Sequence, residues 1–205
     1  MQRARTERGL DRLVNFSDAT VAIAITLLIL PLVDLAGEID DESFGEFFGE
    51  HVGAFVAFLV TFAVIGRFWL IHHRVFEYVR DYSIGLIWCN MLWLASIVFL
   101  PFAANAVSSP SVSNGSFDAL YIGTMFVTTG SMLLLDLELR RHPELLVDGA
   151  RDEIDLSRSI GFLVMLVIAG VLAYLVPTVG MLWVLLLFAA PIASKLARRL
   201  VPALR

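Results

Sequence analysis

Six stretches of the chain, each close to the length of a membrane-spanning helix and poor in charged side chains, constrain the fold more than any other feature. A helix needs about 20 mostly apolar residues to cross the hydrocarbon core of a bilayer. Hydrophobic residues make up 58% of the chain, above the roughly 45–50% usual in soluble domains. We therefore predict an all-α integral membrane protein, one domain over residues 1–205, with spans at about 13–35, 52–72, 83–107, 117–139, 156–177 and 180–200.

The basic residues indicate how these spans are oriented. Loops rich in Lys and Arg stay in the cytoplasm. All 15 basic residues fall before the first span, around the turn between the second and third, in or beside the loop between the fourth and fifth, or near the end of the chain. An even number of spans with both termini in the cytoplasm explains this distribution.

The loop between the first two spans is acidic and contains no basic residue. Its negative field would concentrate cations, although an ordinary solvated acidic loop explains the composition equally well. The acidic residues here are Asp34, Glu38, Asp40, Asp41, Glu42, Glu46 and Glu50. A net charge of −5, with no basic block interleaved with aromatic residues, excludes nucleic acid as a partner.

Polar side chains within the spans gather at one depth, near the predicted cytoplasmic ends. At 1.5 Å rise per residue, several of them lie within roughly 10–15 Å of that interface. A buried Asp18 is costly without a partner, so we expect it to join a network between the first three spans. This network is either a structural clamp or a gating or proton-sensing element, since histidine titrates near neutral pH. Its candidate members are Arg12, Asp18, Arg67, His72, His73, Asn90 and Trp93.

A second face of the first span carries a stripe with i, i+4, i+7 and i+11 spacing. By periodicity alone the stripe predicts a surface that faces lipid or packs against another helix. Thr26 lies beside the stripe, and Thr20 lies nearer the predicted cytoplasmic end of the same helix. Both hydroxyls can bond back to the helix backbone. The stripe consists of Ile23, Leu27, Leu30 and Asp34.

The sequence lacks the motifs that are typical of several functional classes. The chain has no Gly-rich phosphate loop, no H-E-x-x-H zinc site and no G-x-S-x-G elbow, so we predict neither an enzyme nor a cofactor. It has no T-V-G-Y-G filter and no arginine at every third position, which excludes an ordinary potassium filter and a voltage sensor of that type. A carrier would need helices broken at the midplane, but Pro31 and Pro101 lie near the outer ends.

The first span opens with the letters RLVNFSD at residues 12–18, followed by ATVAIAITLLILP. This R-x-x-x-F-S-D signature resembles the transmembrane protein 175 family of lysosomal and prokaryotic potassium channels. The letters WLIHH at 69–73, WCNMLW at 88–93 and FLPF at 99–102 look like the second and third helices of that family. The resemblance covers about the first half of the chain by motif and all of it by helix count.

The resemblance implies a homotetramer in a prokaryotic plasma membrane, with the first helices lining a pore for potassium over sodium. It implies that Ile23 forms the tightest apolar ring and a hydrophobic gate, with Leu27 and Leu30 further out, Asp34 at the outer mouth, and Thr26 and Thr20 as selectivity candidates. A secondary carrier for a small ion or solute is the alternative, and no metal is implied beyond permeating potassium. The implied structural network comprises Arg12, Phe16, Ser17, Asp18, His72, His73, Asn90 and Trp93.

Overall fold

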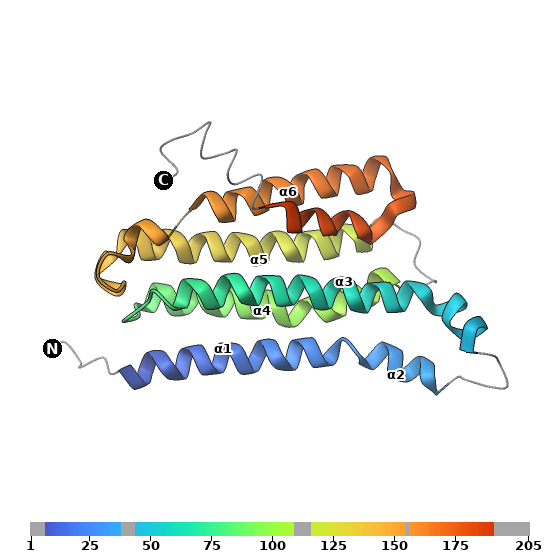
Figure 1. The fold of residues 1–205 in the computed structure, drawn as a ribbon, viewed down its shortest axis with the longest axis horizontal. Coiled ribbons are helices and arrows are strands. Elements are labelled where there is room, and N and C mark those ends of the chain that lie inside the picture. Colours follow the sequence, from blue (N-terminus) through green and yellow to red (C-terminus); the bar gives the residue numbers. More distant parts are fainter. Residues whose placement is uncertain (1–6, 38–43, 109–115, 155, 191–205) are drawn as a thin grey trace.

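The computed structural model describes residues 7–37, 44–108, 116–154 and 156–190. These residues form a bundle of roughly parallel and antiparallel helices (Figure 1). The helices are α1 (Glu7–Leu27), α2 (Leu30–Ala36), α3 (Phe44–Phe76), α4 (Ile84–Ser108), α5 (Ser116–Arg141) and α6 (Leu156–Leu175), with 3₁₀ segments η1 (Pro143–Leu145), η2 (Ala150–Glu153) and η3 (Pro177–Ala189).

Helix α4 lies inside the bundle and packs against α1, α3 and α5. Three of its large side chains, Trp93, Ile97 and Leu100, are fully buried. Their i, i+4, i+7 spacing places them on one face, as expected for a helix that packs on its neighbours. In Figure 1, α1 and α2 flank α3 and α4 on one side, while α5 and α6 lie on the other. The first helix is therefore peripheral in a single chain.

Four described helical segments are long and apolar enough to cross a membrane: Arg8–Ala36, Gly45–Phe76, Ile84–Val107 and Ala119–Arg141. Helix α6 adds a shorter apolar stretch, Ser159–Ala173. The all-α, multi-pass prediction is confirmed. The predicted sixth span at 180–200 lies partly outside the described residues. Its described part belongs to η3, which begins at Pro177, where the sequence predicted a turn. Proline has no N–H to donate and suits the first position of a helix.

Helix α3 begins at Phe44, eight residues before the span predicted at 52–72, and continues to Phe76. Part of the acidic segment is therefore helical rather than a loop. Glu46 lies in the first turn of α3, where a negative charge is favoured by the helix dipole. The hydropathy window missed this turn because it detects apolar residues rather than helix boundaries.

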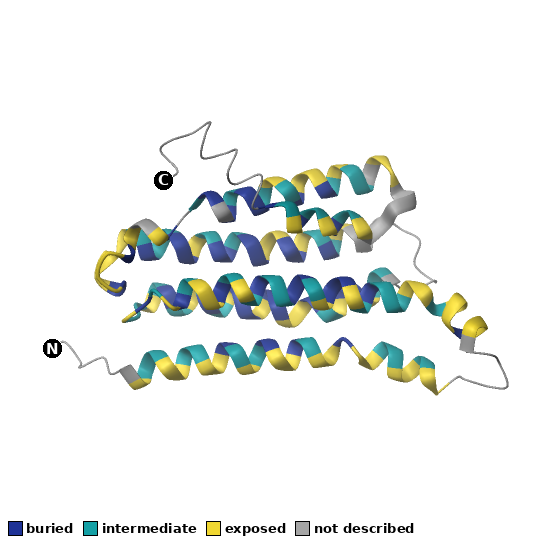
Figure 2. Cartoon of the chain, viewed as in Figure 1, coloured by how far each residue is buried: buried dark blue, intermediate teal, exposed yellow. Residues whose placement is uncertain are grey.

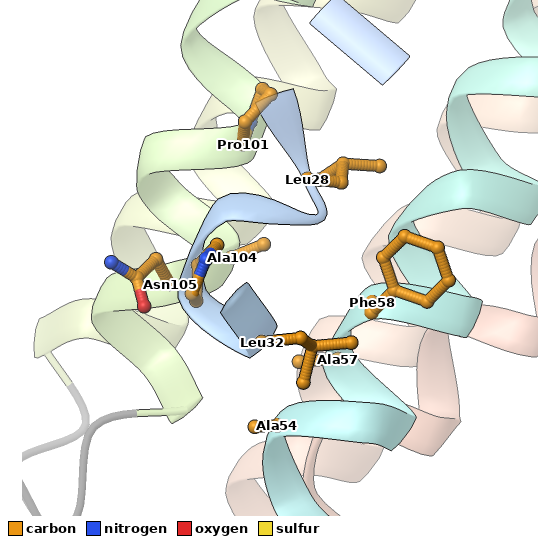
Figure 3. A pocket seen from close by; sticks show the side chains of 9 residues that line it. Leu28, Leu32, Ala54, Ala57, Phe58, Pro101, Ala104 and Asn105 are labelled. Carbon is orange, nitrogen blue, oxygen red and sulfur yellow. The ribbon is translucent and has the colours of Figure 1, made fainter. Parts of the chain in front are cut away.

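The first predicted span is interrupted, because α1 ends at Leu27 and α2 begins at Leu30. Pro31 cannot donate a hydrogen bond to the carbonyl of Leu27, and its ring crowds that carbonyl. The backbone tightens here instead, with Leu28 N donating to Ile25 O at 3.3 Å. Figure 3 shows the break beside Ala57, Phe58 and Pro101. The prediction of one continuous helix over 13–35 is corrected to two helices.

One end of the bundle collects the described arginines. We call it the basic end: α1 begins there, α3 and α5 end there, and α4 and α6 begin there (Figure 1). The turn after α3 docks on the α5–α6 connection through a short antiparallel bridge, in which Arg80 N donates to Leu145 O at 2.8 Å and Val147 N donates to Tyr78 O at 2.9 Å. Arg80 also reaches Asp148, with Nη1 and Oδ1 3.0 Å apart. These contacts join the two halves of the chain.

Substitution of Gly149, which lies next to this bridge, should measurably lower the free energy of unfolding. Its φ is +81°, and a Cβ added there would meet nothing within 4 Å. Gly149→Ala should therefore destabilise the fold by roughly 1–2 kcal/mol through backbone conformation alone. Chemical unfolding in detergent measures this, with Gly130→Ala as the helical control that also meets no neighbour. A neutral Gly149→Ala would show that this connection contributes little to global stability.

Candidate functional site

Helix α1 has two distinct faces. The buried face packs toward α3 and α4, and its i, i+4, i+7 and i+11 spacing is that of an amphipathic helix. It consists of Ser17, Val21, Ala24 and Leu28. The opposite face makes no packing contact within the described chain, and in Figure 2 its exposed residues follow the edge away from the rest of the bundle. The large apolar residues exposed along α1, the break and the start of α2 are Phe16, Ile23, Leu27, Ile29 and Leu30.

The predicted pore residues all lie on exposed surface. Ile23 is 60% exposed, and Leu27 and Leu30 are also exposed. The helix break separates Leu27 on α1 from Leu30 and Asp34 on α2. The stripe was predicted on one continuous helix, but its residues are divided between two helices. Every one of them is exposed.

The two candidate selectivity hydroxyls bond to their own helix. Thr20 Oγ1 donates to Phe16 O at 2.8 Å, and Thr26 Oγ1 donates to Ile23 O at 2.8 Å. Thr26 is exposed and Thr20 is half-buried. This backbone bonding is the ordinary arrangement for a threonine in a helix. It uses the hydroxyl hydrogen, so the oxygen lone pairs remain available as acceptors.

A buried chain of hydrogen bonds joins α1, α3 and α4. Asn90 Nδ2 donates to Ser17 Oγ at 2.9 Å, and Asn90 Oδ1 lies 2.8 Å from His72 Nε2. Ser17 Oγ in turn donates to Leu13 O at 2.9 Å. All three side chains are almost completely inaccessible. Because an unpaired buried polar group is costly, this set of bonds specifies how α1 sits on α3 and α4.

Aromatic stacking holds His72 in place. Its ring stacks against Trp93 at 4.1 Å between centroids and against Phe76 at 4.3 Å. Trp93 is fully buried, and its Nε1 has no hydrogen-bond partner in the described part of the chain. His72 and Trp93 were both candidates from the sequence, and the structure brings them together.

The partner of Asp18 is a residue that sequence reasoning did not select. Trp69 Nε1 donates to Asp18 Oδ1 at 2.8 Å, and the indole stacks on His73 with centroids 5.3 Å apart. His73 is exposed and lies 3.5 Å from Glu77 Oε1. Trp69 opens the W-L-I-H-H motif, so its position in that motif was the available signal.

Two members of the predicted network lie elsewhere. Arg12 and Phe16 are on the exposed face of α1, away from Asn90 and His72. Within the described residues, the Arg12 guanidinium makes neither a hydrogen bond nor an ion pair. In a single chain, the predicted members form two groups: Ser17, Asn90, His72 and Trp93 in one, and Asp18 and His73, which both contact Trp69, in the other. Arg12 and Phe16 belong to neither group.

Long apolar helices, the first of them peripheral, anchored on one face and exposed on the other, are the architecture of a multi-pass integral membrane protein. Residues 12–101 match the model of the family described as endosomal/lysosomal potassium channel TMEM175. The match covers a little under half of the chain and supports the resemblance seen in its R-x-x-x-F-S-D signature.

One solved structure and two bacterial proteins are similar to this chain. The crystal structure of a lysosomal potassium-selective channel TMEM175 homologue from Chamaesiphon minutus has the same fold, with a TM-score of 0.62 and 22% identity over 91% of this chain and 98% of that one. A potassium channel of Chryseobacterium sp. strain P1-3 is 23% identical over 133 residues, 65% of this chain and 67% of that relative. A potassium channel of Streptomyces collinus is 37% identical over 94 residues, 44% of this chain and 43% of the relative.

These comparisons decide two predictions made from the sequence. The family and the structural neighbour are ion channels, so the prediction that the chain is not an enzyme is confirmed. Its bacterial relatives and apolar helices make it a multi-pass protein of the plasma membrane, as predicted.

Proposed function

We propose that the chain is one subunit of a homotetrameric channel selective for potassium over sodium, with α1 lining the pore. The observation that carries the proposal is the asymmetry of α1. One face is held by the buried bonds of Ser17 and Asn90, whereas the other exposes Ile23 and Leu27. Four copies around a closed symmetry axis would turn these exposed faces toward one another.

The proposed gate is the ring of four Ile23 side chains. An apolar constriction of this kind excludes water when it is narrow, and a cation stripped of its water pays a large desolvation cost there. Leu27 and Leu30 would extend the apolar lining beyond the ring. The channel conducts when the ring widens enough to admit water.

Selectivity in this proposal comes from the cost of dehydration. Potassium gives up its water more easily than sodium, so a narrow throat with few strong ligands favours potassium. The hydroxyl of Thr26 donates its hydrogen to Ile23 O. Its oxygen would coordinate a passing cation and replace part of the lost hydration. Thr20 would act in the same way nearer the basic end.

Charge would assist the approach of cations. Asp34 is exposed on α2, at the end of the bundle opposite the basic end. By the positive-inside rule, the basic end would lie in the cytoplasm. Asp34 would then lie at the outer mouth. The acidic residues at 38–43 lie outside the described residues.

The direct test is the reversal potential of the purified protein in a planar bilayer, with potassium on one side and sodium on the other. The proposal expects single-channel steps and a potential displaced toward the potassium equilibrium value. A potential of zero under this gradient would refute potassium selectivity. Saturable, coupled flux without channel steps would instead identify a carrier.

A secondary carrier remains the alternative because of the break between α1 and α2, since discontinuous helices often form carrier binding sites. The surroundings of the break oppose it. The cavity there measures about 20 Å³, which is room for about one water molecule. It offers no charged group to couple transport to an ion, and its lining is Leu28, Pro31, Leu32, Ala54, Ala57, Phe58, Pro101, Ala104 and Asn105.

Asp18→Asn tests whether the signature aspartate anchors the pore helix. A hydrogen bond to a charged group is worth about 1.5–3 kcal/mol, against about 1 for a neutral one. The variant should keep the contact with Trp69 but weaken it, which lowers the tetramer fraction measured by native mass spectrometry. Asp11→Asn, on the exposed part of the same helix, is the control. Normal tetramers with altered selectivity would show that Asp18 acts on the ion rather than on assembly.

A further inference from the structure

Arg67 is a cation inside a membrane-spanning helix, with no charged partner in the part of the chain that the structure describes. It lies in α3, nine residues before the last residue of that helix, Phe76, which corresponds to about 13 Å along the axis. A charged side chain at this depth is costly, so such residues normally pair with an opposite charge or extend to the interface. The structure contains neither a carboxylate ion pair nor a hydrogen bond for Arg67 among the described residues.

An aromatic ring of a neighbouring helix lies against the half-buried Arg67. Its guanidinium carbon lies 5.7 Å from the centroid of the Phe162 ring of α6. Its Nε is buried and has no hydrogen-bond partner among the described residues. The neighbouring ring of Phe68 lies 5.7 Å from Phe162, so the two helices are close at this level. The ring orients the guanidinium by a cation–π contact but does not neutralise its charge.

The carboxylate inside this part of the bundle is already engaged. Asp136 of α5 is buried, and its Oδ2 accepts a hydrogen bond from Ser159 Oγ at 2.6 Å. It makes no ion pair with Arg67. Among the described residues, the Arg67 charge therefore has no carboxylate partner, and we look for one outside them.

A second arginine continues from Arg67 toward the basic end. Arg74 follows seven residues later, which places it on the same face of α3 and about 10 Å further along the axis. It is exposed and has no ion pair among the described residues. Between them lies Leu70, an apolar side chain that is 52% exposed. Its exposure leaves an apolar surface within the span that lipid acyl chains can cover.

From these observations we propose that Arg67 and Arg74, with the ring of Phe162, form a binding site for the phosphate of an anionic phospholipid. The acyl chains lie along Leu70 and the exposed apolar surface of α3. A guanidinium binds a phosphate through parallel hydrogen bonds and is the preferred side chain for that geometry. Anionic lipid is concentrated in the cytoplasmic leaflet, on which the arginines of the basic end would lie.

The bilayer is a better source of the phosphate than the solvent. The site opens beside an exposed apolar side chain within a span, where a lipid arrives with its acyl chains already buried. Free phosphate would have to lose its hydration to reach Arg67. A carboxylate of a neighbouring subunit is the remaining competitor, and the experiment separates all three.

Lipid retention by the full chain in nanodiscs tests the proposal. Discs contain phosphatidylcholine mixed with phosphatidylglycerol, and native mass spectrometry counts the lipids released with the protein. Wild-type protein should retain phosphatidylglycerol in preference to phosphatidylcholine. Arg67→Gln should weaken retention about fivefold, the effect of one basic residue near an anionic surface. Arg67→Lys should fall between the two, because it keeps the charge but loses the paired donors.

Controls and opposing outcomes follow from the same experiment. Arg141→Gln removes an exposed arginine at the same end of the bundle and should leave retention unchanged. If Arg67→Gln does not fold, Arg74→Gln carries the test and should also reduce retention. The proposal would be overturned if the wild type retained both lipids equally. It would also be overturned if Arg67→Gln and Arg74→Gln both retained phosphatidylglycerol as well as the wild type does.

Two further arms exclude the other sources. Inorganic phosphate added in millimolar excess should not displace the lipid. Displacement, or equal binding of inorganic phosphate in lipid-free detergent, would identify a free-anion site instead. A change in oligomeric state of Arg67→Gln in pure phosphatidylcholine, with phosphatidylglycerol retention unaltered in mixed discs, would identify a contact between subunits.

Discussion

Ile23→Ala is expected to raise the basal potassium current at least several-fold, the largest functional effect of any single substitution in this chain. The reason is that the proposed gate excludes ions through its apolar bulk. Replacing the side chain by a methyl group removes that bulk from every subunit at once, so the throat widens and wets more readily. Single-channel recording in planar bilayers would measure this as an increased open probability, an increased unitary current or both.

The position of Ile23 makes this prediction specific to function. Its side chain is 60% exposed in the single chain, so truncation leaves no cavity in the fold of the subunit. Leu59→Ala is the matched control, because Leu59 is a similarly large apolar residue that is 62% exposed on α3. The control should leave the current at its wild-type level. Unchanged current in Ile23→Ala with intact tetramers would remove Ile23 from the gate.

The same substitution should also relax selectivity. If potassium is favoured because a narrow throat forces dehydration, a wider throat lets both cations keep more water. The reversal potential of Ile23→Ala under the potassium and sodium gradient should then move toward zero. A larger current with unaltered selectivity would separate the gate from the filter and direct attention to Thr26.

Much of this architecture could be predicted from the sequence, because the bilayer imposes strong rules on it. Long apolar stretches and one-sided arginines indicated a multi-pass helical protein, and the signature at 12–18 indicated the resemblance that the match over residues 12–101 supports. The inward-facing half of that signature, Ser17 and Asp18, does contact α4 and α3, through Asn90 and Trp69 respectively.

Other features depend on three-dimensional information that periodicity does not carry. Pro31 was placed near the outer end of a helix, but its steric effect acts on the carbonyl four residues earlier, which shifts the break to Leu28 and Ile29. Trp69 was missed because an indole in an apolar helix ordinarily reads as packing. Its role as a donor to Asp18 depends on how α1 and α3 are rotated relative to each other.

The break between α1 and α2 and the buried hydrogen bonds of α1 make the two parts of the proposed pore helix different. Helix α1 is fixed on its buried face by side-chain hydrogen bonds to α3 and α4. Helix α2 has no fully buried residue. Such a segment moves more easily than one held by buried bonds. In the proposed channel, the ring at Ile23 would therefore belong to the fixed part, and Leu30 and Asp34 to the freer outer part.

Asn90→Leu is expected to produce the largest loss of stability among these variants. Asn90 is fully buried and bridges Ser17 and His72. A leucine of similar size leaves His72 Nε2 buried without a partner, and each buried polar group left unpaired costs about 1–3 kcal/mol. Unfolding in detergent, followed by circular dichroism, should show the loss together with a fall in tetramer yield.

A double-mutant cycle with His72→Phe identifies the cause. Phenylalanine keeps the stack on Trp93 and Phe76 but carries no group that needs Asn90, and replacing both partners of a buried hydrogen bond can be nearly neutral. The double variant should therefore be more stable than the sum of the single losses predicts, with a coupling of about 0.5–3 kcal/mol.

Ser96→Ala, which removes only a hydroxyl bonded to Trp93 O on the same helix, should cost much less than Asn90→Leu. Strict additivity between Asn90 and His72 would mean that packing of α4, rather than this hydrogen bond, holds the proposed pore helix in place.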